Sequence, residues 1–364
     1  MDFRLDDDQL ALQAGMRQLL ERCFSRERLR EAVDAQEVRG VQRGGRRGDR
    51  QGVQQVVQQV VQGSQGFRRT STGWDVGRAL WRELGEAGFF ALRLPEKGGG
   101  VGLGVPEAVL LFEEAGRALV PGPLVATHLA AGLVPGAAEG TRVVTALTGP
   151  GTAEHLGAAD SVLLLDGAGA RVMATDGGTG PRVLDARPVQ SVDPLTPLYA
   201  VQELPSPALT RLMTDGDGGR LCSEATLLTA AQQLGSALRT LDMAVLHAGT
   251  RRQFGRPIGS FQAVQHLCAR MLVRAEIARS GVYAASLTMA NCDIAGAKLL
   301  ADEAAVRNAR DCLQVHGGMG FTWDADVHLH LKRAWLRREQ WRTPAAAEEE
   351  LAAGLLAGDG HGAA

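Results

Sequence analysis

The feature that most constrains the fold is a set of three long helical patterns in the last third of the chain. Apolar residues recur there every three or four positions, which is the spacing of one helix face. They are Leu227, Ala231, Leu234, Leu238, Leu241, Val245 and Ala248, then Val264, Leu267, Met271, Ala275 and Ala278, then Leu300, Ala304, Ala309 and Leu313. Such helices bury their apolar faces against one another. The sequence therefore predicts an antiparallel helical bundle over residues 219–345, followed by a flexible tail over 346–364.

The rest of the chain predicts two further regions. Short runs of β-branched residues, separated by Gly, Pro and Asp, predict a small, shortened β-domain over residues 141–218. Helical stripes that end at Pro or Gly predict an N-terminal helical domain over residues 1–140. Within it, residues 36–72 are rich in Gln, Arg and Gly without an apolar stripe, so we expect them to be disordered. The predicted fold class is mainly α with a β insert.

Composition argues against several classes of protein. The 39 Lys and Arg residues are balanced by 41 Asp and Glu residues, which leaves no overall positive field to bind nucleic acid. The five scattered cysteines predict reduced thiols without a disulfide framework or metal-ligand spacing. The acidic N-terminus lacks a signal-peptide pattern, and no run reaches the roughly 18 apolar residues of a membrane span. We therefore expect a cytoplasmic protein without membrane insertion, nucleic acid or a bound metal ion.

Two segments among the helical patterns contain groups that suit a phosphorylated ligand. Residues 251–262 read RRQFGRPIGSFQ, and residues 314–321 read QVHGGMGF. Arg251 offers a guanidinium group that can hydrogen-bond to two phosphate oxygens at once. Gly317 and Gly318 leave space for the main chain to approach a ligand. The two segments together therefore offer groups that suit a phosphate-bearing ligand.

Both segments resemble the acyl-CoA dehydrogenase family, where R-x-Q-F-G-x-P-[IL]-x-x-F-Q and Q-x-[HYF]-G-G-x-G bind the adenosine diphosphate half of FAD. The resemblance extends over about residues 1–35 and 74–340. It implies a helical N-terminal domain, a middle β-domain and a C-terminal four-helix bundle, with FAD as the cofactor. It assigns cofactor contacts to Arg251, Gln253, Phe254, Gln262, Gln314, Gly317 and Gly318. The implied reaction is α,β-dehydrogenation of an acyl-CoA thioester to trans-2-enoyl-CoA. Electrons would pass to an electron-transferring flavoprotein, and the family usually forms tetramers.

The chain departs from the family pattern in two places. Family members have a T-E-x-x-x-G-S-D-like segment that meets the flavin ring, whereas residues 145–151 read TALTGPG. Their catalytic glutamate takes the α-proton of the substrate, and its usual position falls here on Trp341, with Glu339 nearby. In a minority of members the glutamate lies at the start of the first bundle helix. That position falls on Ala225, beside Glu224.

The catalytic base of this chain is therefore unassigned, with Glu224 and Glu339 as the candidates. A helix-capping role explains Glu224 and a solvent-facing role explains Glu339. The pattern resembles the short, base-lacking subunits of heteromeric α2β2 members, in which the partner chain supplies the glutamate. Two alternatives stay open: a flavin-dependent monooxygenase on the same fold, and a non-catalytic assembly subunit.

Overall fold

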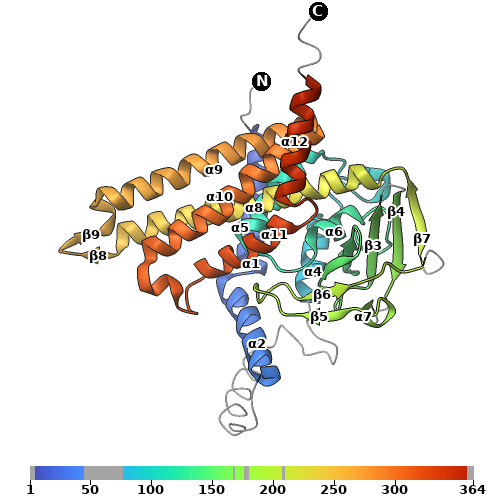
Figure 1. Cartoon of the computed structure of the whole chain (residues 1–364), viewed down its shortest axis with the longest axis horizontal. Helices are drawn as coiled ribbons and strands as arrows, with labels where there is room; N and C mark the ends of the chain where they lie inside the picture. Colours follow the sequence, from blue (N-terminus) through green and yellow to red (C-terminus); the bar gives the residue numbers. More distant parts are fainter. Residues whose placement is uncertain (1–4, 45–76, 167–168, 176–179, 207–209, 359–364) are drawn as a thin grey trace, which may run out of the picture. The chain divides into compact units, whose positions relative to one another are not determined.

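The structure is a computed structural model that describes residues 5–44, 77–166, 169–175, 180–206 and 210–358. The chain divides into two compact units, each built from separated segments (Figure 1). The first unit comprises Met1–Leu20, Leu103–Val120 and Arg220–Ala364, and the second comprises Glu21–Gly102 and Pro121–Gly219. A mostly helical chain is interrupted by the strands β1–β7. The predicted fold class, mainly α with a β insert, is confirmed.

The first unit contains the three long helices that the apolar stripes predicted. They are α8 (Gly218–Thr250), α9 (Gln262–Thr288) and α10 (Asn291–His316). The unit also contains the first part of α1 (Asp7–Cys23) and the shorter helices α5 (Val105–Arg117), α11 (Val327–Glu339) and α12 (Pro344–Gly358). One apolar cluster joins α8, α9, α10 and α11 and includes Ala248, Met271, Leu313 and Leu331. Burial of these faces stabilises the bundle.

Helices α5 and α8 cross at close range because each has a glycine at the crossing. A Cβ atom on Gly116 of α5 would lie 2.0 Å from the carbonyl oxygen of Gln232. A Cβ atom on Gly235 of α8 would lie 1.8 Å from the carbonyl oxygen of Glu113. Any side chain would therefore force the two helices apart. The glycine pair fixes α5 against a helix more than a hundred residues later in the sequence.

Residues 344–358 form helix α12, so the prediction of a flexible tail from residue 346 is wrong for this part. Ala347 is fully buried, and Arg342 and Glu350 form an ion pair of 2.8 Å. A Cβ atom on Gly354 would lie 3.1 Å from that of Cys292, which shows how closely α12 packs on α10. The Ala, Glu and Leu residues of this stretch favour a helix, which explains why it is ordered.

The second unit contains the β insert and several short helices. Its helices are α2 (Arg26–Gly44), α4 (Arg78–Glu86), η1 (Glu96–Gly98), α6 (Leu124–Leu129) and α7 (Gly180–Val183). Helix α2 includes residues 36–44, so the prediction of disorder is wrong there, because α2 continues to Gly44 without a proline to end it. The remainder of the predicted disordered stretch, residues 45–72, lies outside the described residues.

The strands form two small sheets. A four-stranded sheet has the order β1-β3-β4-β7, and a three-stranded sheet has the order β2-β6-β5. The strands are β1 (Val144–Leu147), β2 (Gly151–Glu154), β3 (Ser161–Asp166), β4 (Gly169–Ala174), β5 (Arg187–Val189), β6 (Leu198–Val201) and β7 (Arg211–Asp215). Strands β1 and β3 run parallel, whereas β3 and β4 are antiparallel. Residues from both sheets, including Leu147, Val162 and Val201, share one apolar cluster.

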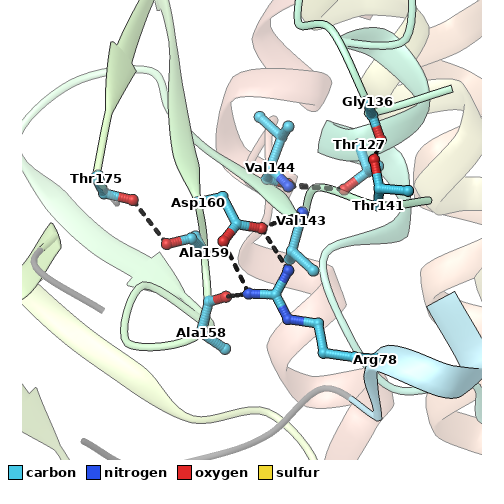
Figure 2. A network of polar contacts seen from close by, with 10 residues as sticks. All are labelled: Arg78, Thr127, Gly136, Thr141, Val143, Val144, Ala158, Ala159, Asp160 and Thr175. Atoms are coloured by element: carbon cyan, nitrogen blue, oxygen red, sulfur yellow. Dashed lines mark hydrogen bonds and ion pairs between the residues drawn. The ribbon is translucent and has the colours of Figure 1, made fainter. Parts of the chain in front are cut away.

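A polar network attaches the helices of the second unit to its sheet (Figure 2). Arg78, the first residue of α4, donates to the Asp160 carboxylate and, at 2.9 Å, to the carbonyl oxygen of Ala158. The Asp160 carboxylate also accepts a hydrogen bond of 2.8 Å from the backbone of Val143. The Thr127 hydroxyl of α6 exchanges two 3.0 Å hydrogen bonds with the backbone of Val144. Helix and strand are therefore joined at the start of β1.

Candidate functional site

The first cofactor segment forms a β-hairpin that follows α8 directly. Strands β8 (Arg252–Gln253) and β9 (Arg256–Pro257) pair in antiparallel register. The turn residues Phe254 and Gly255 have φ angles of 50° and 77°, and two positive φ angles in a two-residue hairpin loop are the signature of a type I′ turn. The hairpin extends beyond the ends of α8 and α9 (Figure 1). Phe254, at its tip, is 92% exposed.

Arg251 is fixed through its backbone while its side chain remains exposed. Its amide donates a hydrogen bond of 2.8 Å to the carbonyl oxygen of His247, and its carbonyl oxygen accepts one of 2.8 Å from Ile258. The guanidinium group makes no hydrogen bond or ion pair with any described residue of this chain, in contrast to Arg252, which donates to the carbonyl oxygen of Gly255 at 2.9 Å. The N–H donors of the Arg251 guanidinium are therefore available to an acceptor outside the described residues.

The second cofactor segment forms the turn that ends α10. Gly317 adopts a φ angle of 62°, which favours glycine, and begins the short helix η4 (Gly317–Phe321). Among the described residues, apart from the chain neighbours of each glycine, no atom lies within 4 Å of the place where a Cβ on Gly317 or Gly318 would lie. Gln314, Gly317 and Gly318 are exposed. The surface above the two glycines is therefore open to a ligand or to another chain.

The structure brings the two segments to the same end of the first unit. The rings of His247 on α8 and His316 on α10 stack with their centroids 4.1 Å apart. The apolar cluster of the bundle also contains Ala248 and Val315, with Ile258 packed against it. Gln262 lies at the start of α9, immediately after the hairpin, and is exposed. The predicted cofactor residues thus lie on adjacent helix ends.

The base candidates lie elsewhere on the first unit and differ in environment. Glu224 is only 1% exposed and lies seven residues into α8, not at its N-terminus, with an ion pair of 3.7 Å to Arg220. The capping interpretation of Glu224 is therefore wrong, because α8 begins earlier, at Gly218. Glu339 is the last residue of α11 and is exposed. Trp341 is half-buried and has a φ angle of 62°.

Sequence reasoning missed two buried polar groups in the first unit. Glu113 of α5 is 3% exposed and accepts a hydrogen bond of 2.8 Å from the Tyr283 hydroxyl. Lys298 and Asp302 of α10 form a fully buried ion pair. The spacing of four residues between Lys298 and Asp302 was a usable signal. Glu113, in contrast, lies in the run LLFEEAG, where nothing indicates which glutamate is buried.

Two kinds of site are not found in the described part of the chain. No group of three or more His, Cys, Asp or Glu side chains there could bind a metal ion. None of its helices is long and apolar enough to cross a membrane.

Comparison with known families identifies the chain. Residues 49–144 match the model of the acyl-CoA dehydrogenase N-terminal domain, and residues 223–338 match that of the C-terminal domain. The chain belongs to the acyl-CoA dehydrogenase family. FAD is the cofactor of this family. The first match begins inside the stretch 36–72, so part of that stretch is recognisable family sequence.

Individual relatives support this membership. The chain is 36% identical over 265 residues to the acyl-CoA dehydrogenase IpdE2 of Mycolicibacterium smegmatis, covering 70% of this chain and 81% of that protein. It is 35% identical over 319 residues to the acyl-CoA dehydrogenase FadE34 of Mycobacterium tuberculosis, covering 77% of this chain but only 44% of FadE34. The chain thus spans less than half the length of FadE34.

A solved complex has the same fold. The ChsE4-ChsE5 complex from Mycobacterium tuberculosis superposes with a TM-score of 0.73 at 24% identity, over 98% of this chain and 99% of the matched chain.

Proposed function

We propose that this acyl-CoA dehydrogenase chain contributes the adenosine-diphosphate-binding half of an FAD site that it shares with a partner chain. The assembly would oxidise an acyl-CoA thioester to trans-2-enoyl-CoA and pass electrons to an electron-transferring flavoprotein. One observation is the main support. The two cofactor segments lie exposed at adjacent helix ends, and the Arg251 guanidinium makes no hydrogen bond or ion pair with any described residue of the chain.

Each of these groups suits a part of the adenosine diphosphate moiety. Arg251 would bind the pyrophosphate through two charge-assisted hydrogen bonds. Gly317 and Gly318 allow the backbone to approach the same group, since no side chain intervenes. Amide groups of Gln253, Gln262 and Gln314 would bind ribose or adenine edges. Phe254 offers an exposed apolar ring, which suits contact with a ligand or a neighbouring chain better than contact with water.

The catalytic base is proposed to come from the partner. A base must reach the α-proton of the substrate and exchange protons during turnover. Glu224 is buried and paired with Arg220, whereas Glu339 is exposed at a helix end, where its charge is solvated. The ion pair with Arg220 engages the Glu224 carboxylate, and water solvates that of Glu339, so neither is placed as a free base in a dry site. The ChsE4-ChsE5 relative, solved as a complex of two differently named chains, lends support to a mixed assembly.

The division of labour follows from these positions. FAD, when bound, supplies the acceptor for the hydride that leaves the β-carbon. The residues of this chain would orient the dinucleotide by its pyrophosphate, while the partner removes the α-proton. Arg251 and the diglycine turn therefore affect retention and position of the cofactor and do not themselves exchange protons with the substrate.

Flavin retention tests the proposal. The chain is purified alone and after co-expression with a glutamate-bearing acyl-CoA dehydrogenase chain, and its visible spectrum is recorded. Arg251→Ala should weaken FAD retention about a hundredfold or more, because two charge-assisted bonds of roughly 1.5–3 kcal/mol each are lost. Arg307→Ala is the matched control, since Arg307 lies exposed on α10 and pairs with the nearby Glu303 at 3.1 Å.

Other outcomes point to the alternative functions. Undiminished flavin in the Arg251→Ala assembly would reject the shared site and make the two segments structural remnants. FAD that forms a peroxyflavin with oxygen would favour a monooxygenase. Absence of flavin from the chain both alone and with a partner would favour a non-catalytic assembly subunit.

A further inference from the structure

A stacked pair of histidines joins the two helices that end in the cofactor segments. His247 lies in the last turn of α8, four residues before Arg251. His316 is the last residue of α10 and directly precedes Gly317. Their ring centroids are 4.1 Å apart, and the ring planes meet at 20°. This contact connects the two segments through side chains at the ends of α8 and α10.

The His316 ring is fixed by a hydrogen bond within α10. Its Nδ1 atom lies 2.8 Å from the carbonyl oxygen of Cys312, so Nδ1 bears a hydrogen and donates it. The same nitrogen lies 3.6 Å from the Cys312 thiol. One ring therefore has a set orientation, and the His247 ring rests against its face. A change in either ring would alter the spacing between the hairpin and the diglycine turn.

The surroundings of the stack disfavour positive charge on it. Burial lowers the pKa of His247 below its ordinary value of 6.5, and His316 and Arg251 lower it further. From α10 the stack is faced by Cys312, whose pKa is raised by burial and by Cys268 on α9. These thiols are uncharged near neutral pH, so they do not offset a positive charge on the histidine stack. An anion bound at Arg251 would remove part of the repulsion that His247 experiences.

We propose that the His247–His316 stack sets the spacing of the two cofactor segments and takes up a proton when the FAD pyrophosphate binds at Arg251. This inference rests on the proposed function. The bound anion raises the pKa of His247, so the form protonated on His247 binds FAD more tightly. The affinity for FAD then increases as the pH falls through the range in which His247 titrates. Above that range the affinity no longer depends on pH. For one proton, the limit is about a tenfold change in Kd per pH unit.

The test is an FAD titration of the full chain, with its partner where the two co-purify, by flavin fluorescence between pH 5.5 and 8. FAD is a suitable probe because its internal pyrophosphate does not titrate in this range. Wild type should bind FAD several-fold more tightly at pH 5.5 than at pH 7.5. His247→Phe, which keeps a stacked ring, should keep the affinity at pH 7.5 and lose the pH dependence. His247→Ala should bind more weakly at every pH.

His328→Phe is the matched control. His328 lies on α11 and stacks on Trp323 with the centroids 5.0 Å apart, so it forms a histidine–aromatic stack separate from the His247–His316 pair. This variant should keep the wild-type pH profile. A His247→Phe profile as steep as that of wild type would overturn the inference, as would a flat wild-type profile with normal FAD binding. If wild type binds no FAD at any pH, the proposed function fails as well. This outcome is distinguishable from the two above, in which wild type still binds FAD.

Discussion

The hydroxyl group of Tyr283 on α9 donates a hydrogen bond of 2.8 Å to the buried carboxylate of Glu113 on α5. Gln13 of α1 donates a second hydrogen bond of 3.1 Å to the same carboxylate. One carboxyl group therefore connects three helices that are distant in sequence. Burial raises the pKa of Glu113 to about 6, although the hydrogen bond from Tyr283 opposes this effect.

Glu113→Gln should stabilise the protein above neutral pH. The pKa of the folded state, about 6, exceeds the ordinary value of 4.5. The stabilising contribution of Glu113 is thus fully present below pH 4.5 and is lost as the pH rises through 6. At pH 8 the buried charge costs on the order of 2 kcal/mol. The amide avoids this cost and can still accept the hydrogen bond from Tyr283.

Thermal unfolding at several pH values between 5 and 8 measures this effect. The gain in Tm of Glu113→Gln over wild type should increase with pH. Glu303→Gln is the control, because Glu303 is exposed on α10 and its substitution should change Tm little at any pH. A Glu113→Gln protein that is less stable than wild type at pH 8 would show that the ionised carboxylate stabilises the helix junction.

Removing one partner of the buried Lys298–Asp302 pair should strongly destabilise the first unit. Burial lowers the pKa of Lys298 and raises that of Asp302, while their mutual attraction opposes both shifts. The Lys298 ammonium also donates to the carbonyl oxygens of Arg337 and Arg338 at 3.1 and 3.2 Å, and so binds the end of α11. Lys298→Met should cost about 3–5 kcal/mol, because it leaves a buried carboxylate unpaired.

Urea unfolding of three variants checks this prediction. They are Lys298→Met, Asp302→Leu and the double variant. The double variant should lose clearly less stability than the sum of the two single losses, since it buries no unpaired charge. Additive losses would show that the two groups act independently in spite of their contact.

Valine substitutions at Gly318 and Gly320 should separate cofactor binding from folding. A Cβ on Gly318 would meet no atom of the described residues beyond its chain neighbours within 4 Å, whereas one on Gly320 would lie 3.0 Å from the His316 Cβ and from the Leu313 carbonyl oxygen. Gly318→Val should therefore keep the wild-type Tm and lose FAD by steric exclusion. Gly320→Val should lower Tm. FAD absorbance and thermal unfolding measure both, and full flavin occupancy in Gly318→Val would contradict the proposed contact.

The long helices were predictable because their apolar residues repeat at helical spacing over about four to six turns. The cofactor segments were predictable because Arg251 and the glycines at 317 and 318 lie in distinctive local sequences. Their juxtaposition through His247 and His316 was not predictable, since it depends on where two separate helices end.

Contacts between segments that are distant in sequence explain where the structure differs from the sequence-based predictions. The burial of Glu113 results from the approach of Gln13 and Tyr283, which no local pattern encodes. The many alanines of α12 form no clear apolar stripe, so the sequence does not indicate a packed helix there. The packing of α12 against α10 nevertheless buries Ala347. Ser223, directly before Glu224, is a favoured N-cap residue, so the local sequence indicates a helix start at this point. The additional turn from Gly218 moves Glu224 into the interior of the helix.

Glu224→Gln provides the test of which chain supplies the catalytic base. Glu224 is buried on α8, and its carboxylate lies 3.7 Å from the guanidinium of Arg220, whose side chain is 57% exposed. The amide keeps the shape of the side chain but cannot take a proton. If the partner supplies the base, kcat of the assembled enzyme should remain within about twofold of wild type, and flavin content should not change. Arg220→Gln controls for the loss of the ion pair, and a fall in kcat by orders of magnitude in Glu224→Gln alone would assign the base to this chain.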